Sequence, residues 1–346
     1  MMGGPMAAFD TKAGRDGADS EAMRPAKYEL NRRRLVAKAS KRREKMIAFG
    51  YYGGKFSHLD FILPLLPTSY FHYCEPFAGS AAVMINRPAA AVETYNDLDS
   101  EVANFFKALR DNSDELIKRI ALTPFSREEL VVANSGEAIT DGLERARRFF
   151  VRARQTRTGL AQTSSEGRWA HCVLTSRAGM AGAVSRWLGS AEGLAEIVQR
   201  LQRVQIENAP AIEVIRRYDS PSTLFYCDPP YPHEARGDSK AYGYELTDEG
   251  HQELAAVLHG AEGAVAISGY SCELMDRLYG DWVRVDAPPH LCNSSKTKRI
   301  ESLWLNYPVP EEAALVFAEQ QLPLVVKEPR AKYSAKKRDA GKKKTR

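Results

Sequence analysis

The sequence predicts an α/β protein in which strands and helices alternate to build a doubly wound sheet. Short apolar runs typical of buried strands alternate with amphipathic helical segments along most of the chain. Three informative stretches fall at predicted strand ends, where such sheets bind their ligands. Residues 112–200 break the alternation and are typical of an inserted, mostly helical subdomain.

The predicted elements follow one another in order along the chain. Runs of β-branched, aromatic and other apolar residues indicate strands at 69–80, 89–99, 203–210, 222–232, 263–270, 282–288 and 300–308. Helical periodicity or start signals indicate helices at 58–67, 81–86, 100–112, 186–201, 248–261 and 272–280. We therefore expect a main domain built from residues 49–111 and 201–310, and an insertion at 112–200.

The charges of the 346-residue chain, net +5, are unevenly distributed. Residues 24–45 and residues 327–346 each carry ten Lys or Arg against two acidic residues, a net +8 in each segment. We expect a disordered basic arm at residues 1–48 and a basic tail at residues 311–346. The translation start is left open between Met1 and Met46, which stands just before the first globular segment.

A third basic segment lies inside the insertion. Residues 142–186 hold nine arginines against Glu144 and Glu166. Charged tails alone also serve solubility, but an internal cluster favours a polyanionic partner. No apolar run approaches the length of a membrane span, and the N-terminus lacks the pattern of a signal peptide. Because the five cysteines are scattered without a metal-ligand spacing, we expect no metal site and a reducing cytoplasm.

Two of the strand-end stretches are suited to a nucleotide-like ligand. In "EPFAGS" (75–80), a glycine turn lets the backbone approach a ligand and leads into a helix, although an ordinary turn fits equally well. The G-x-G-x-x-G pattern of dinucleotide sites is absent. In "YNDLD" (95–99), an acid can accept hydrogen bonds from ribose hydroxyls; we prefer Asp97, because Asp99 better suits a helix N-cap.

The third stretch, "LFYCDPPYP" (224–232), presents hydrogen-bond acceptors and almost no donors. Each proline lacks an N–H and forces the preceding residue into an extended conformation. The Asp228 carboxylate and the main-chain carbonyls can therefore receive both hydrogens of an exocyclic amino group, and Tyr231 can stack on a planar base. Two prolines that merely end a strand are the alternative interpretation.

These motifs resemble those of the Dam-like DNA adenine N6-methyltransferases, which use S-adenosylmethionine. "DPPY" at Asp228, Pro229, Pro230 and Tyr231 matches the family's catalytic motif, and "YYGGKF" resembles its N-terminal cofactor motif through Tyr51 and Lys55. "EPFAGSAAV" resembles the F-x-G-x-G cofactor loop through Phe77 and Gly79, with Ala81 in place of the second glycine; Asp97 matches the ribose-binding acid. The motif order is that of the alpha class, and the resemblance covers about residues 49–308.

The resemblance implies a Rossmann-like methyltransferase sheet with the insertion as target-recognition subdomain. Asp228 and the Pro229 carbonyl would hold the N6 amino group of an adenine flipped out of double-stranded DNA, with Tyr231 stacked on the ring. Lys55 would contact cofactor, base or phosphate, or remain a solvated lysine. The insertion's arginines would hold phosphates or read guanines, and we single out four DNA-contacting candidates: Arg152, Arg154, Arg157 and Arg168.

Several alternatives stay open from the sequence. Cytosine N4 or RNA adenine methylation would use the same acceptor surface, and a catalytically silent nucleic-acid-binding module is the rival from another class. We expect a monomer in the cytoplasm of a bacterium or a phage-infected cell. The sequence does not decide whether a cognate restriction enzyme accompanies the protein.

Overall fold

A computed structural model of the chain describes residues 45–235, 245–288, 290–291, 298–320 and 322–329. The described residues from Met46 onward belong to one compact unit. Most of the predicted basic arm lies outside the described residues. Its end does not: Ala48 is fully buried, and Met46 exchanges two hydrogen bonds of 2.8 Å with the side chain of Asn86.

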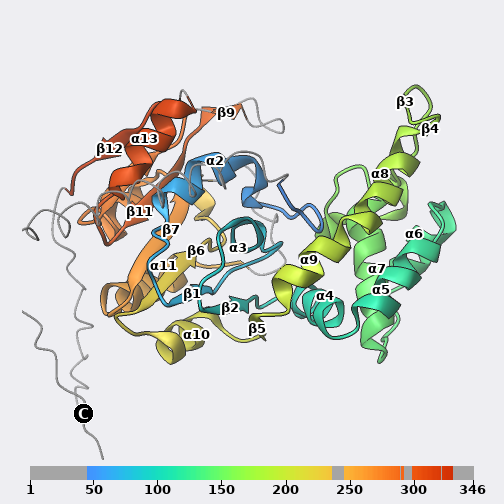
Figure 1. Cartoon of the computed structure of the whole chain (residues 1–346), viewed down its shortest axis with the longest axis horizontal. Helices are drawn as coiled ribbons and strands as arrows, with labels where there is room; N and C mark the ends of the chain where they lie inside the picture. Colours follow the sequence, from blue (N-terminus) through green and yellow to red (C-terminus); the bar gives the residue numbers. More distant parts are fainter. Residues whose placement is uncertain (1–44, 236–244, 289, 292–297, 321, 330–346) are drawn as a thin grey trace, which may run out of the picture. The chain divides into compact units, whose positions relative to one another are not determined.

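An eight-stranded mixed sheet forms the centre of this unit (Figure 1). From one edge to the other the strands run β5 (Val204–Glu207), β2 (Val92–Asn96), β1 (His72–Glu75), β6 (Thr223–Cys227), β7 (Ala264–Tyr270), β11 (Glu301–Leu305), β8 (Val283–Asp286) and β12 (Val325–Lys327). The five strands from β5 to β7 are parallel, and β11, β8 and β12 add antiparallel pairs. The α/β prediction is confirmed, with a mixed rather than purely parallel sheet.

The strand order reverses beside β1. The chain proceeds from β1 through β2 to β5 on one side, and returns to the other side of β1 with β6 and then β7. β1 pairs with both β2 and β6 in parallel, so that His72 lies opposite Val92 on one side and Thr223 on the other. The carboxyl ends of β1, β2 and β6 therefore meet at one point of the sheet edge, where ligands of such sheets bind.

Helices pack against both faces of the sheet, because its central strands are apolar on both sides. In β6, Leu224 and Tyr226 contribute to one core cluster, while Phe225 and Cys227 contribute to the other. The first core includes residues of α2 (Leu59–Ile62), α3 (Ala82–Asn86), α4 (Ser100–Asp111) and α13 (Glu311–Glu319). The second includes residues of α10 (Ala211–Tyr218), α11 (Asp248–His259) and α12 (Glu273–Leu278).

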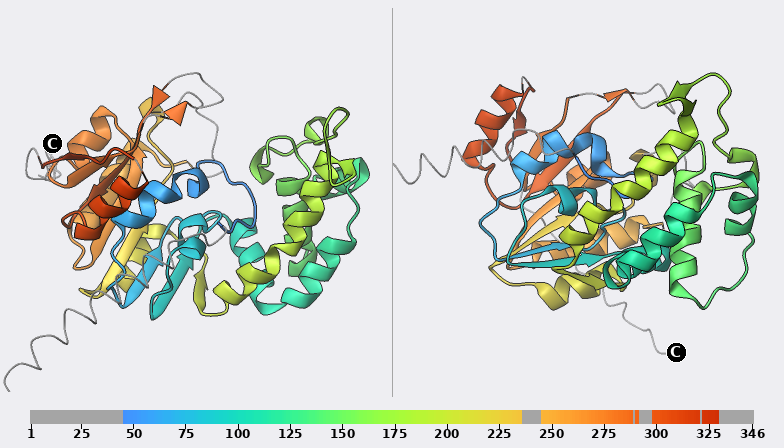
Figure 2. Two further views of the ribbon diagram at one scale, coloured as in Figure 1. Left: turned by 45° about the horizontal axis from the view of Figure 1, so that its top comes forward. Right: turned by 45° about the vertical axis from the view of Figure 1, so that its right-hand side comes forward.

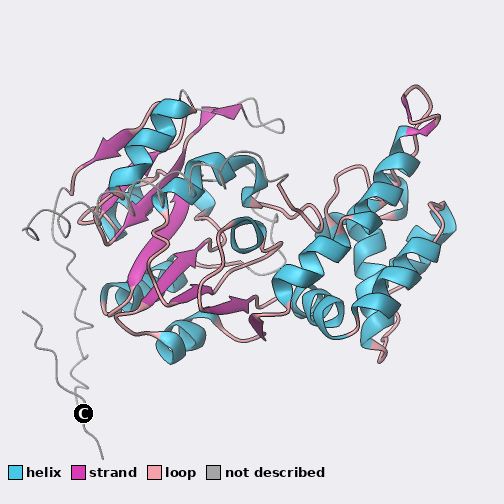
Figure 3. Cartoon of the chain, viewed as in Figure 1, coloured by secondary structure: helices cyan, strands magenta, loops and turns pink. Residues whose placement is uncertain are grey.

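The segment that interrupts the strand alternation is mainly helical, as expected (Figure 3). It contains α5 (Ser113–Leu122), α6 (Arg127–Ala133), α7 (Gly142–Arg154), α8 (Gly182–Glu192) and α9 (Leu194–Leu201). Its core is continuous with that of the sheet, since Phe150 of α7 stacks on Phe105 of α4 with ring centroids 5.6 Å apart. A short hairpin of β3 (Ser176–Arg177) and β4 (Met180–Ala181) leads into α8 (Figures 1 and 2).

The predicted C-terminal tail needs a correction at its start. Residues 311–319 form α13, whose Phe317 is buried with its ring centroid 6.1 Å from that of Phe61. β12 then pairs with β8, and Lys327 forms a 2.6 Å ion pair with Asp286. The many charges from residue 327 onward suggested a tail, but the apolar residues before them pack on the sheet. Residues 330–346 lie outside the described part of the chain.

Candidate active site

A cavity lies at the carboxyl ends of β1, β2 and β6. It is lined by residues 51–55 of the N-terminal segment, by the turn after β1, by Asp97, Leu98 and Asp99 after β2, and by Asp228 and Pro230 after β6. Glu245 and Leu246, which precede α11, also line it. Seven of the candidate site residues from the sequence thus meet at one place: Tyr51, Lys55, Phe77, Gly79, Asp97, Asp228 and Pro230.

Asp97 organises the turn between β1 and α3. Its two carboxylate oxygens accept hydrogen bonds from the backbone N–H groups of Gly79, at 2.7 Å, and Asp99, at 2.8 Å. Burial raises the pKa of Asp97 to about 6, although both backbone hydrogen bonds act in the opposite direction. Asp99 instead caps α4 by accepting from the N–H of Glu101 at 2.9 Å, as its sequence position suggested.

The glycine turn brings the backbone into close contact with Tyr51. Gly79 has a φ of +49°, and a Cβ atom at this position would lie 2.7 Å from Cδ1 of the Tyr51 ring. Only glycine avoids both the strained conformation and the clash. Ala81, which stands in the place of the motif's second glycine, adopts a similar left-handed conformation with φ 55°. The backbone therefore keeps a glycine-like path at a steric cost of roughly 1–2 kcal/mol.

Asp228 is held in place by two donors. The hydroxyl of Ser268 donates to Oδ1 at 2.8 Å, and the ammonium of Lys55 lies 2.7 Å from the same oxygen. Lys55 also donates to the carbonyl of Gly53 at 2.6 Å, and its side chain is only 5% exposed. The interpretation of Lys55 as a solvated lysine is therefore wrong, because burial and two short contacts fix its ammonium inside the cavity.

Tyr231 points away from solvent. It is 3% exposed, its hydroxyl donates to the carboxylate of Glu301, and Tyr270 meets its ring edge-on with centroids 4.8 Å apart. The Lys55 ammonium lies 4.9 Å from the centre of the Tyr231 ring. Stacking of this ring on a base stays a prediction, and it requires that a base enter the space beside Lys55.

Two buried carboxyl groups near Asp228 were not identified from the sequence. Glu301 opens β11 and Glu75 closes β1; burial raises the pKa of Glu301 to about 7 and that of Glu75 to about 8. Glu75 accepts a 2.6 Å hydrogen bond from Tyr73. The available signal was an acid at the end of an otherwise apolar strand. Among the described residues, no group of three or more His, Cys, Asp or Glu side chains could hold a metal ion.

Two of the four DNA-contacting candidates are used inside the protein. Arg152 donates to the carbonyl of Ala133 at 2.8 Å and forms a 3.0 Å ion pair with Glu101. Arg154 donates to the carbonyl of Ala48, and burial lowers its pKa to about 10. Neither guanidinium is presented to a partner in this conformation. Arg152 thus ties α7 to α6 and α4, and Arg154 ties α7 to the N-terminal segment.

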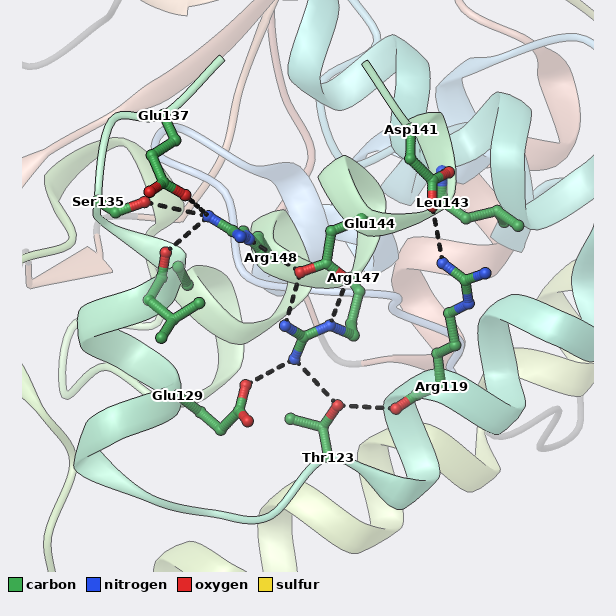
Figure 4. Close-up of polar contacts among 12 residues, drawn as sticks. Arg119, Thr123, Glu129, Ser135, Glu137, Asp141, Leu143, Glu144, Arg147 and Arg148 are labelled. Carbon is green, nitrogen blue, oxygen red and sulfur yellow. Dashed lines mark hydrogen bonds and ion pairs between the residues drawn. The ribbon is translucent and has the colours of Figure 1, made fainter. Parts of the chain in front are cut away.

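The arginine cluster on α7 is likewise neutralised locally (Figure 4). Arg147 donates to Glu144 and Glu129 at 2.7–2.8 Å and to the Thr123 hydroxyl at 3.1 Å. Arg148 pairs with Glu144 at 2.9 Å. The nine arginines of this segment therefore overstate the positive charge that α7 offers to a partner.

The exposed cations lie farther along the insertion. Arg157 and Arg168 are on the surface, where they donate to the carbonyls of Gly167 and Thr163 at 2.8 Å. Arg177 is exposed at the turn of the β3–β4 hairpin. Just before the hairpin, Val173 and Leu174 are 84% and 95% exposed. Large apolar side chains this exposed beside cations are typical of a binding surface.

Comparisons with known proteins match a large part of the chain to one family. The model of the D12 class N6 adenine-specific DNA methyltransferase family matches residues 51–288. The type II methyltransferase M1.LlaDCHI of Lactococcus lactis subsp. cremoris is 39% identical over 77 residues, which span 22% of this chain and only 26% of the relative. A solved Legionella pneumophila protein, LPL1258, covers 81% of this chain and 98% of its own at 14% identity and a TM-score of 0.31.

Proposed function

The chain belongs to the D12 class N6 adenine-specific DNA methyltransferases, and on this premise we propose that it transfers a methyl group from S-adenosylmethionine to the N6 amino group of an adenine in double-stranded DNA. The observation that carries the proposal is the convergence of Asp228, Lys55 and Asp97 on one cavity at the reversal of strand order. The finer architecture is part of the same proposal: a doubly wound methyltransferase sheet, with residues 112–200 as target-recognition subdomain.

The cavity is suited to this cofactor. Asp97 can accept from ribose hydroxyls with the lone pairs that its two backbone donors leave over, and Phe77, Leu98 and Leu246 supply apolar surface for a purine. Five carboxyl groups line the cavity against one cation, Lys55, among the residues that the structure describes. Such a lining favours a positively charged ligand. When bound, S-adenosylmethionine supplies a methyl group on a positive sulfur, whose carbon–sulfur bond breaks as N6 attacks.

The chain's own contribution is to position the amine. Asp228 Oδ1 and the Pro229 carbonyl accept the two N6 hydrogens, which directs the nitrogen lone pair away from the ring. Ser268 fixes the carboxylate by its 2.8 Å hydrogen bond, so that little reorganisation is needed at the moment of attack. Asp228 is the nearest acceptor for the proton that the methylated amine releases. Positioning and fixed charge account for most of the catalysis.

We propose that the hairpin side of the insertion contacts the DNA. Arg157, Arg168 and Arg177 supply exposed cations for phosphates or bases, and the exposed Val173 and Leu174 supply apolar contacts. Flipping the adenine out of the stack costs a few kcal/mol, which these contacts offset. A single chain holds every residue of the proposed site, which is consistent with a monomer. No helix in the described part of the chain is long and apolar enough to span a membrane.

The proposal is tested by product analysis. The protein is incubated with unmethylated genomic DNA and S-adenosylmethionine, and the digested nucleosides are analysed by mass spectrometry. We expect N6-methyladenine from the wild type and at least a roughly thousandfold lower rate from Asp228→Ala, because the amine loses its charged acceptor. N4-methylcytosine as the product, methylation of RNA but not DNA, or no product at all would each contradict the proposal.

A further inference from the structure

We propose that Glu301 is a positioning residue that takes over the ammonium of Lys55 when the target amine claims Asp228. This inference rests on the proposed function, and it assigns Lys55 a movement rather than a fixed contact. The described residues show three parts: a carboxylate that the amine needs, a cation that occupies it, and a second carboxylate beside that cation.

The first step is the competition for Asp228. The Lys55 ammonium lies 2.7 Å from Asp228 Oδ1, and the hydroxyl of Ser268 donates to the same oxygen at 2.8 Å. These two donors use both lone pairs of Oδ1. An amine that binds Oδ1, as proposed above, therefore displaces the Lys55 ammonium from this oxygen.

The second step is the destination of Lys55. Its side chain is 5% exposed, so a withdrawn ammonium would be left without water unless an anion received it, and an unpaired buried charge is strongly destabilising. Glu301 Oε1 lies 3.9 Å from the ammonium. A shift of about 1 Å would bring the two groups into hydrogen-bond distance. The Gly53 carbonyl, which accepts from Lys55 at 2.6 Å, can guide the movement without supplying a charge.

The Glu301 side chain is held in place by its neighbours. The residue is 3% exposed and opens β11, where it lies opposite Tyr270 of β7 in the sheet. Its Oε1 accepts from the hydroxyl of Tyr231. Ser268 fixes Asp228 in a similar way. The cation thus lies between two fixed carboxylates, and movement of one flexible lysine side chain suffices for the exchange.

The charged and titratable groups around Glu301 agree with this role. Asp228 raises the pKa of Glu301, whereas Lys55 and the Tyr231 hydroxyl lower it; burial is the largest influence and brings the value to about 7. Tyr226 of β6 and Glu75 of β1 are further buried titratable groups near this site. An ionised Glu301 can receive Lys55 and a protonated one cannot. Methyl transfer should therefore rise with pH as Glu301 loses its proton.

A double-mutant cycle tests the exchange. Wild type, Glu301→Gln, Lys55→Met and the double variant are compared by single-turnover methyl transfer to unmethylated genomic DNA. Glu301→Gln keeps an acceptor for Tyr231 but removes the charge. We expect it to slow the wild type about 10- to 100-fold, the range for losing a charged hydrogen-bond partner. In the Lys55→Met background, which has no cation to transfer, the same change should slow the reaction no more than about threefold.

Two controls separate this role from a structural one. The cofactor Kd and the melting temperature of each variant report whether the cavity and fold persist, and Tyr231→Phe keeps the Glu301 charge while removing the tyrosine hydrogen bond. Equal losses from Glu301→Gln in both backgrounds, or a rate profile near pH 7 that this variant leaves unchanged, would overturn the inference alone. A wild type that binds the cofactor but methylates no DNA would overturn the proposed function instead, and this inference with it.

Discussion

Two charged regions of this protein differ in how their charges are compensated. On α7 the guanidinium groups of Arg147 and Arg148 meet the carboxylates of Glu129 and Glu144 within 2.9 Å. At the carboxyl ends of β1, β2 and β6, by contrast, Glu75, Asp97 and Asp228 share the neighbourhood of a single cation, Lys55, among the described residues. The arginines of α7 are the more conspicuous charges in the sequence, but in the fold they are more nearly neutralised than the carboxyl groups at the strand ends.

This difference in charge compensation indicates which of the two regions can bind a charged ligand. Neutralised pairs on a helix surface stabilise the helix packing but leave little field for a partner. Carboxyl groups held together at the end of a sheet keep raised pKa values, of about 6 for Asp97 and about 8 for Glu75, because burial disfavours their charges. Such a cluster persists at a cost in stability, and a cationic ligand lowers that cost. Perturbed groups in a cavity therefore point to function more reliably than a count of arginines.

The largest effect is expected from the acid that organises the cavity. Asp97→Ala removes two short hydrogen bonds to backbone N–H groups and the proposed ribose acceptor, so we expect about a 100-fold weaker cofactor Kd, measured by isothermal titration calorimetry. The matched control is Asp99→Ala, which loses a helix cap worth about 1 kcal/mol of stability and leaves the cofactor Kd within about threefold. If Asp99→Ala weakened cofactor binding more than Asp97→Ala, the two acids would have to exchange roles.

An intermediate effect is expected on α7. Arg147→Ala leaves Glu129 and Glu144 without their shared partner, so we expect the free energy of unfolding to fall by about 2 kcal/mol in urea titrations, with the cofactor Kd unchanged. Arg177→Ala, on the exposed hairpin, provides the contrast. It should change stability by less than about 0.5 kcal/mol and reduce the salt dependence of DNA binding by about one unit of slope. If Arg147→Ala and Arg177→Ala changed the free energy of unfolding equally, the ion pairs of Arg147 would not contribute to stability as expected.

The smallest effect is expected in the pH dependence of the cofactor-free protein. Glu75 and Glu301 have folded-state pKa values of about 8 and about 7, above the ordinary value of 4.5. Between the ordinary value and these raised values, the folded state therefore binds more protons than the unfolded state. Their contribution to stability is complete below about pH 4.5 and is lost as the pH rises through 7 to 8. We expect the melting temperature to fall by a few degrees from pH 5.5 to 8, and to fall less in Glu75→Gln. A melting temperature that rises over this interval would show that the two carboxyls are ionised at neutral pH.

The sequence predicted the parts of the site that depend on local pattern. Motifs at predicted strand ends located Gly79, Asp97 and Asp228, because parallel strands bring such ends together whatever their separation in the chain. Whether Lys55 was buried could not be predicted, since its neighbours Asp228 and Glu301 lie far away in sequence. The same reason applies to Arg152 and Arg154, whose partners Glu101 and Ala48 come from other segments. Composition reports how many charges exist, but only the tertiary structure reports which are already paired.

The backbone conformation of Ala81 also could not be predicted from the sequence motif. Alanine disfavours the left-handed region that glycine would favour, yet the φ of Ala81 is 55°. The hydrogen bond from the Ala81 N–H to the Ala78 carbonyl, at 2.7 Å, closes the turn and holds this conformation. Tertiary packing around the fully buried Ala81 thus overrides the residue's own preference.

The meeting of Lys55 with Asp228 and Glu301 also sets a condition on how the protein is made. Lys55 stands near the start of the described chain, whereas Glu301 belongs to one of the last strands, 301 − 55 = 246 residues later. A ribosome working at roughly 5–20 residues per second needs about 12–50 s to cover that distance. Throughout this interval the nascent chain lacks the second carboxylate and the β11 strand that carries it. The pairing of Lys55 with both carboxylates is therefore complete only once nearly all of the described chain has been synthesised.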